Sequence, residues 1–161
     1  MCCAICFSEI LHLNVRSQET GVRSQKEENQ TTGSWLLTSD FSMYSQNVLD
    51  HFHHPRNVGE IAEATAVVEM TNPVCGDLMK LWVVAREGKI LDAKFKAEGC
   101  IPAVACGSWL AEAIVGKSIQ DLASITAMQI EAALGGLPPA SRHASALAAD
   151  ALKRVLQALQ G

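Results

Sequence analysis

The sequence predicts an α+β protein in which a three-stranded antiparallel sheet packs against helices. Three segments with strand-like patterns come first, and helical patterns fill most of the remainder. Short connections between the strand segments favour antiparallel neighbours, and strands followed by a run of helices are typical of an α+β layer. Apolar residues make up 48% of the 161 residues, which is enough for a packed core.

The strand segments are separated by recognisable turn residues. Residues 64–70 and 78–86 are rich in Val and Leu, and we expect residues 71–77 to form the loop between them. Residues 87–89 (Glu-Gly-Lys) predict a hairpin turn. Residues 90–97 alternate, which predicts a strand with one wet face. The expected inner residues are Leu91, Ala93, Phe95 and Ala97, and the expected outer residues are Ile90, Asp92, Lys94 and Lys96.

Helices are predicted before and after the strand segments along the chain. Residues 44–53 carry one apolar face and stop before a proline, and residues 102–115 begin with a proline and stop at a glycine. Capping boxes start further helices at Ser118 and Thr126. The last helix begins near Ser141 and has an apolar stripe facing the core.

Composition also divides the chain into two parts. Residues 16–34 are rich in Gln, Glu, Ser and Thr and show neither the strand nor the helix period. We therefore expect residues 1–42 to be a disordered N-terminal extension and residues 43–161 to form one folded domain.

Charge and hydropathy exclude several classes of function. The net charge is −4 without a basic cluster, which argues against binding DNA or RNA. No apolar run has the length that a bilayer span needs. Residues 1–15 lack the basic residues of a secretory signal, so we expect no membrane association and a cytoplasmic location.

Cysteines are the main candidates for chemistry, because in a reducing compartment they are metal ligands, catalytic thiols or buried apolar residues more often than disulfides. Cys2, Cys3 and Cys6 lie in the extension, and Cys75, Cys100 and Cys106 lie in the domain. Cys75, Asp77, Cys100 and His143 have the donor types that bind zinc or iron. Their spacing alone leaves open a metal site or two buried structural thiols.

Four motifs in order resemble those of the IscU/NifU-type iron–sulfur cluster assembly scaffolds. The matching segments are MYSQNVLDHFHHPRNVG at 43–59, VCGD at 74–77, KFKAEGC at 94–100 and LPPASRHAS at 137–145. The resemblance implies an IscU/SufE-like fold for residues 43–161. Met43 aligns with the residue at which proteins of this family usually begin. We therefore expect that residues 1–42 come from a translation start assigned upstream of the true one.

The resemblance also implies a site. In that family, three cysteines with an Asp or His hold a transient [2Fe–2S] cluster, or Zn²⁺ in the resting form. By position, Cys75, Asp77, Cys100 and His143 are the corresponding residues, and Ala144 replaces the third cysteine. Cys106 lies about one turn into the helix that follows Cys100. It either replaces the missing third thiol or is a small apolar residue packed on the sheet, and we favour the second interpretation.

The function implied is a non-enzymatic scaffold. It would receive sulfur from a cysteine desulfurase and iron, assemble the cluster and transfer it to apo-proteins, and a homodimer could share the cluster. The segment after LPP lacks the Val-Lys of forms that Hsp70/J-type chaperones bind, which weakens the case for that partner. Because the third cysteine is absent, two alternatives stay open: a zinc-bound sulfur acceptor and a desulfurase adaptor without a metal.

The other polar clusters favour structural roles. His51, His53 and His54 crowd the end of a helix, where histidines are more often solvated or capping than metal ligands. Lys94 and Lys96 fit the wet face of a strand, although they could meet an acidic partner.

Overall fold

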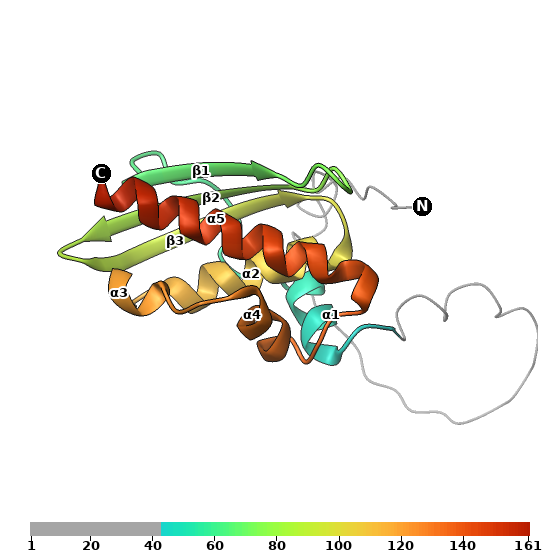
Figure 1. Cartoon of the computed structure of the whole chain (residues 1–161). Coiled ribbons are helices and arrows are strands. Elements are labelled where there is room, and N and C mark those ends of the chain that lie inside the picture. The colour runs from blue at the N-terminus through green and yellow to red at the C-terminus, as the bar shows by residue number, and fades with distance from the viewer. Residues whose placement is uncertain (1–42) are drawn as a thin grey trace, which may run out of the picture.

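The computed structural model describes residues 43–161, and the predicted disordered extension lies outside the described residues. Three strands, β1 (Ala66–Thr71), β2 (Leu78–Arg86) and β3 (Lys89–Glu98), form an antiparallel sheet in the order β1-β2-β3 (Figure 1). The α+β class and the three-stranded antiparallel sheet are confirmed. Of the predicted strands, residues 78–86 have the bounds that the sequence indicates.

The hairpin between β2 and β3 is tight and irregular. Glu87 and Gly88, the two central residues of the turn, both have positive φ, as a type I′ hairpin turn requires. The register shifts between Val84 and Ala85, so that Val84 pairs with Asp92 and Ala85 pairs with Ile90. Leu91 is therefore left without a partner residue on β2.

This irregularity makes one sequence prediction wrong. Ile90 is buried, whereas Leu91 is 52% exposed, the reverse of the expected assignment. A residue inserted into one strand moves all residues beyond it to the opposite face, because side chains alternate with a period of two. The rest of the alternation is confirmed, since Ala93, Phe95 and Ala97 are buried.

The helices follow the predicted order. They are α1 (Gln46–His53), α2 (Ile101–Ile114), α3 (Ile119–Leu122), α4 (Ala127–Ala133), the short 3₁₀ helix η3 (Pro139–Ser141) and α5 (Arg142–Gln160). The reciprocal capping box at Thr126 is present. Gly135 and Gly136 have positive φ directly after α4, where the chain turns toward the segment that carries His143.

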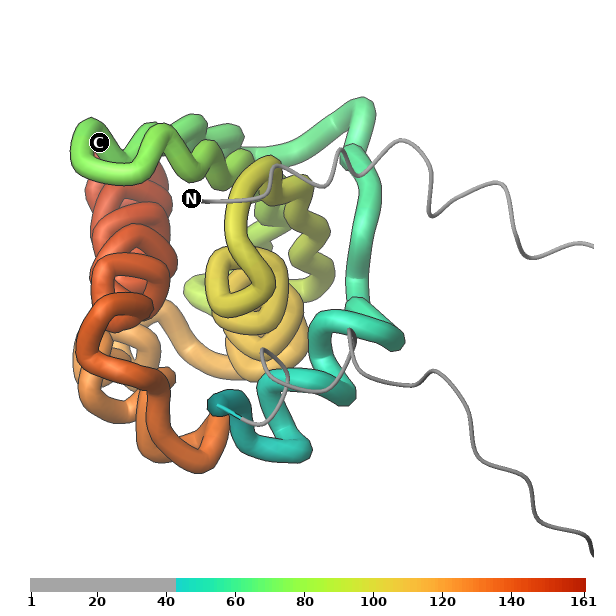
Figure 2. The backbone as a smooth tube through the Cα atoms, turned by 90° about the vertical axis from the view of Figure 1, so that its right-hand side faces the viewer, coloured from blue at the N-terminus to red at the C-terminus, as the bar shows by residue number. Residues whose placement is uncertain are grey.

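The core lies between the sheet and the helices. Figure 2 views the fold along α2, which is enclosed by the sheet, α1, α4 and α5. Small residues on α2 allow this close packing: a Cβ on Gly107 would lie 2.5 Å from the ring of Phe95. Within residues 43–161, no helix is long and apolar enough to cross a membrane.

Candidate metal centre

Three segments that are far apart in the sequence meet at one end of the sheet. They are the loop 71–77, the junction between β3 and α2, and the first turn of α5, and they carry Cys75, Asp77, Cys100 and His143. The Asn72 side chain folds the loop by accepting from the amide of Val74 at 2.9 Å. Gly76, at φ +77°, donates its N–H to the Asn72 carbonyl at 2.8 Å.

Asp77 connects the loop to the start of α2. Its carboxylate is buried, with 2% of the residue exposed. Oδ1 accepts a hydrogen bond from the backbone N–H of Cys100 at 3.2 Å, and Oδ2 accepts from the Cys100 thiol at 3.1 Å. A buried carboxylate needs such donors because burial without them is costly. Asp77 therefore fixes both the backbone and the side chain of Cys100.

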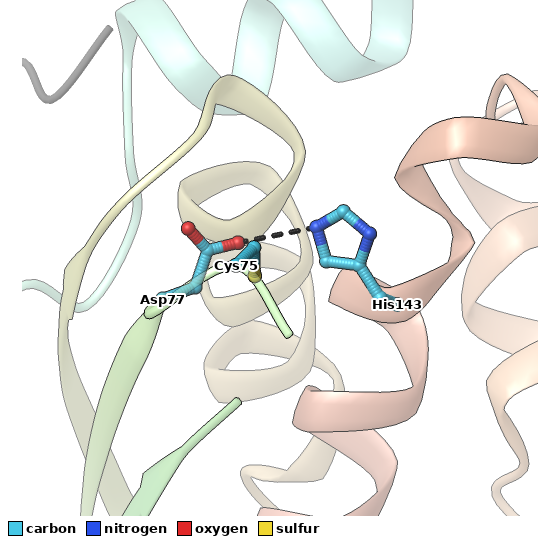
Figure 3. Close-up of side chains that lie close together, drawn as sticks. All are labelled: Cys75, Asp77 and His143. Atoms are coloured by element: carbon cyan, nitrogen blue, oxygen red, sulfur yellow. Dashed lines mark ion pairs between the residues drawn. The ribbon is translucent and has the colours of Figure 1, made fainter. Parts of the chain in front are cut away.

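His143 completes the cluster from the side of α5. Its Nε2 lies 3.4 Å from Asp77 Oδ2, an ion-pair geometry shown by the dashed line in Figure 3, and 4.0 Å from Cys100 Sγ. One possible ligand atom each from Cys75, Asp77 and His143 lies within 4.8 Å of the others. Within residues 43–161, no other group of three or more such side chains comes together in this way.

This donor set fits a metal centre. Two thiols, a carboxylate and an imidazole are the ligands that zinc takes in tetrahedral sites. Iron in iron–sulfur clusters prefers thiolates, although imidazole ligation also occurs. The structure thus brings Cys75, Asp77 and His143 together as one group of close ligand atoms. Cys100 lies beside this group, with its thiol 3.1 Å from Asp77 Oδ2 and 4.0 Å from His143 Nε2.

The state of the Cys100 thiol is determined by its burial more than by its place at the start of α2. Its position as the N-cap of α2 predicts a stabilised thiolate, and a hydrogen bond with the backbone of Ala103 acts in that direction. Burial of the thiol has a larger effect, and together with its hydrogen bond to Asp77 it raises the pKa to about 12. Without a metal, Cys100 is a protonated thiol that donates to Asp77.

Cys106 and Ala144 are both residues of the hydrophobic core. Cys106 is fully buried in the hydrophobic core, and burial raises the pKa of its thiol. Ala144, directly after His143, is also fully buried. Cys106 does not belong to the group of close ligand atoms, so its surroundings are those of a core residue.

Gly99 is a functional position that the sequence reasoning did not single out. Its φ is +149°, and a Cβ there would lie 2.2 Å from Oδ1 of Asp77. The glycine is thus what allows the carboxylate to reach the amide of Cys100. A glycine directly before a candidate ligand at the end of a strand is the signal that could have identified it.

The histidines and lysines outside the centre have local partners. His51 is buried, and its Nδ1 lies 2.9 Å from the hydroxyl of Ser108 on α2. His54 lies 3.4 Å from Asp50, and Lys96 forms an ion pair with Glu60 at 2.7 Å. His54 and Lys96 are exposed and locally paired, as the sequence favoured, whereas His51 is buried against α2 and is neither solvated nor capping.

Comparison with known proteins places this geometry in a family. Residues 43–161 match the family described as NifU-like N terminal domain. The chain belongs to this family of IscU/NifU-type proteins. The matched range coincides with the predicted folded domain and contains all four residues of the centre.

Curated relatives and a solved structure agree with the assignment. The chain is 46% identical over 114 residues to "Iron-sulfur cluster assembly scaffold protein IscU 1" of Archaeoglobus fulgidus, covering 71% of this chain and 74% of the relative. It is 41% identical over 111 residues to the IscU scaffold protein of Aquifex aeolicus, covering 68% and 71%.

Among solved structures, the putative iron–sulfur cluster assembly scaffold protein for the SUF system from Fervidobacterium islandicum matches with a TM-score of 0.60 and 25% identity. The match covers 73% of this chain and 99% of that protein.

Proposed function

We propose that this protein is an iron–sulfur cluster assembly scaffold. It receives sulfur from a cysteine desulfurase, combines it with iron, holds a transient [2Fe–2S] cluster and passes the cluster to apo-proteins, without turnover of its own. The observation that carries the proposal is the convergence of Cys75, Asp77, Cys100 and His143 from three segments. Similarity to proteins named as cluster assembly scaffolds supports it.

Cys75 is the thiol that we assign to sulfur transfer. Cys106 is fully buried, whereas Cys75 is partly exposed and lies in the loop before β2. Cys100 is also partly exposed, but burial and its hydrogen bond to Asp77 raise the pKa of its thiol to about 12, which disfavours the thiolate that sulfur transfer needs. The Cys75 thiolate attacks the outer sulfur of the desulfurase persulfide, the sulfur–sulfur bond breaks, and the desulfurase thiolate leaves. Cys75 then carries the persulfide beside the other ligands, where a two-electron reductant such as a dithiol converts its outer sulfur to the sulfide of the cluster.

The cluster is cargo, so its ligands need to release it. Oxygen ligands from a carboxylate bind a sulfur-rich iron centre more weakly than thiolates do, and Asp77 already has alternative contacts within the protein. We therefore assign Asp77 the role of holding Cys100 and weakening retention of the cluster.

Reconstitution of the full chain tests the proposal. The purified protein is treated anaerobically with ferrous iron, cysteine, a cysteine desulfurase and a thiol reductant, which converts persulfide sulfur to sulfide, and is then assayed for iron, sulfide and visible absorption. Persulfide is assayed in a parallel reaction without iron or reductant. We expect about one sulfide per iron and transfer of the cluster to an apo-ferredoxin. Cys75→Ser should lose both cluster and persulfide, and the matched control Cys106→Ser should keep both. Persulfide is located by mass spectrometry of peptides, which separates Cys75 from the N-terminal cysteines.

A second function is favoured by Ala144, which stands where the family pattern has a third cysteine. With Cys75, Asp77 and His143 as close ligands and the Cys100 thiol beside them, the protein would instead hold Zn²⁺ and serve as a sulfur acceptor. One tight zinc ion per chain with no cluster after reconstitution would support this alternative. Binding of neither metal would leave a desulfurase adaptor.

Ala144→Cys distinguishes the first two functions. If the two-thiol centre holds a cluster weakly, the added thiolate should prolong the lifetime of that cluster. If the site is built for zinc, the variant should gain little.

A further inference from the structure

The first turn of α5, which carries His143, lacks two features that usually stabilise the start of a helix. Its N-cap residue, Ser141, forms no side-chain hydrogen bond to the helix, and the first turn contains no acidic residue. A capping side chain and a negative charge near the first N–H groups normally hold a helix start in place. The position of His143 therefore depends on contacts from outside α5.

Glu131 of α4 supplies these contacts. Its Oε1 accepts a hydrogen bond from the hydroxyl of Ser145 at 2.7 Å, and its Oε2 lies 3.6 Å from Nε of Arg142. The Ser145 hydroxyl also lies 2.7 Å from the backbone carbonyl of Arg142. Because Arg142 and Ser145 are three positions apart, they lie on one face of the helix. The Glu131 carboxylate thus contacts α5 on either side of His143 in the sequence.

The two contacts of Glu131 differ in their surroundings. Ser145 is fully buried, and only 20% of the Glu131 side chain is exposed, whereas the Arg142 side chain is 64% exposed. A hydrogen bond from a hydroxyl to a carboxylate is strong where water is excluded, and an exposed ion pair contributes little. The bond to Ser145 is therefore the main contact between the carboxylate and α5.

Helix α4 is anchored independently of α5, so it gives the carboxylate a fixed position. Ile130 and Leu134 on α4 are fully buried. The hydroxyl of Ser45, before α1, donates to the carbonyl of Leu134. Asn47 on α1 donates to the carbonyl of Ala133 at 3.2 Å. A carboxylate on a helix held at its C-terminal end by another element can fix the turn that lies against it.

We propose that Glu131 is the positioning residue of His143. By holding the first turn of α5 through Ser145, it keeps Nε2 of His143 3.4 Å from Oδ2 of Asp77 and 4.0 Å from Sγ of Cys100. This inference rests on the proposed function, because it treats His143 as a ligand of the centre. Residues that orient a ligand in this way typically change metal affinity about 10–100-fold when they are replaced.

Co²⁺ binding to the full chain, followed by visible absorption, tests the proposal. All proteins carry Cys2→Ser, Cys3→Ser and Cys6→Ser, so that the N-terminal thiols do not bind the probe. Glu131→Ala and Ser145→Ala should each weaken Co²⁺ binding about tenfold. Glu131→Gln keeps an oxygen acceptor for Ser145 and loses only the exposed ion pair, so its affinity should stay within about twofold of the wild type.

Val155→Ala is the matched control for a general loss of stability. Val155 is fully buried on the same helix, about 18 Å further along it than His143. This variant should be destabilised in urea unfolding without weaker Co²⁺ binding. In a His143→Ala background, Glu131→Ala should weaken Co²⁺ binding no further, because its effect acts through the imidazole.

NMR of the metal-free protein gives a readout that needs no metal. Nuclear Overhauser contacts between the His143 ring and the β protons of Cys100 should be present in the wild type and in Glu131→Gln, and lost in Glu131→Ala. Unchanged contacts in Glu131→Ala, equal weakening of Co²⁺ binding by Glu131→Ala and Val155→Ala, or a further loss in the His143→Ala background would each overturn the proposal. A wild type that binds no Co²⁺ would contradict the proposed metal centre, and the NMR contacts would still decide the role of Glu131.

Discussion

Replacing Gly99 with alanine should disrupt the metal centre and the fold together. The new Cβ would lie 2.2 Å from Oδ1, 2.6 Å from Cγ and 2.9 Å from Cβ of Asp77, so the carboxylate must move. Moving it breaks its hydrogen bonds from the amide and the thiol of Cys100.

Two contributions add up to a large loss of stability. A non-glycine residue at φ +149° costs about 1–3 kcal/mol. Loss of hydrogen bonds to a buried charged group costs about 1.5–3 kcal/mol more. We therefore expect Gly99→Ala to lower the free energy of unfolding by about 2.5–6 kcal/mol, a large share of the 5–15 kcal/mol that domains usually have.

Urea unfolding of the full chain measures this loss, with Gly88→Ala as the control. Gly88 has φ +74°, but a Cβ at this position would meet no atom within 4 Å, so alanine there should cost only about 1–2 kcal/mol of backbone strain. In an Asp77→Gly background, which removes all three contacted atoms, Gly99→Ala should cost no more than its backbone strain. Equal losses for Gly99→Ala and Gly88→Ala in the wild-type background would refute the reasoning.

Three further predictions concern the core, pH and metal. Gly107→Ala should destabilise the fold by about 1–2 kcal/mol in urea unfolding, because overpacking against Phe95 outweighs the better helix propensity of alanine; an increase in stability would contradict this packing. Burial and the charge of Arg56 lower the pKa of His51, so its contribution is present above its unfolded pKa of about 6.5 and is lost as pH falls toward the folded pKa. Unfolding free energies across that range should therefore fall more in the wild type than in His51→Gln, and parallel curves would exclude this role. Zinc at about a hundredfold excess over its dissociation constant should stabilise the wild type by about 2.7 kcal/mol and Cys75→Ser much less. Thermal unfolding measures both stabilities, and an equal rise in melting temperature for the two proteins would remove Cys75 from the ligand set.

Local sequence patterns predicted most of the fold. The bounds of β2 and the Thr126 capping box depend on residues close in sequence, and the structure confirms them, whereas α2 begins at Ile101, one residue before the predicted start. The assignment of Leu91 failed because the shift between Val84 and Ala85 has no local marker in the alternation. A pattern of period two cannot reveal where one residue has been inserted.

The candidate metal centre was harder to predict from the residues than the fold was. Donor types identified Cys75, Asp77, Cys100 and His143 as candidates, but their spacing left a metal site and buried structural thiols equally open, and the family resemblance favoured the site. The contact of Asp77 with Cys100 joins residues 23 positions apart, and it depends on how the loop closes over the β3 exit. Burial of the Cys100 thiol, which reverses the expected effect of the helix start, likewise arises only in the folded chain.

The hydrogen bonds among the candidate ligands affect how cargo would enter and leave. Oδ2 of Asp77 lies close to both the Cys100 thiol and Nε2 of His143, so the residues satisfy one another when no metal is bound. An incoming metal must displace these contacts and release the thiol proton, and a departing one allows them to form again. The protein therefore has a stable unloaded state to return to, which suits repeated cycles of loading and delivery better than permanent retention.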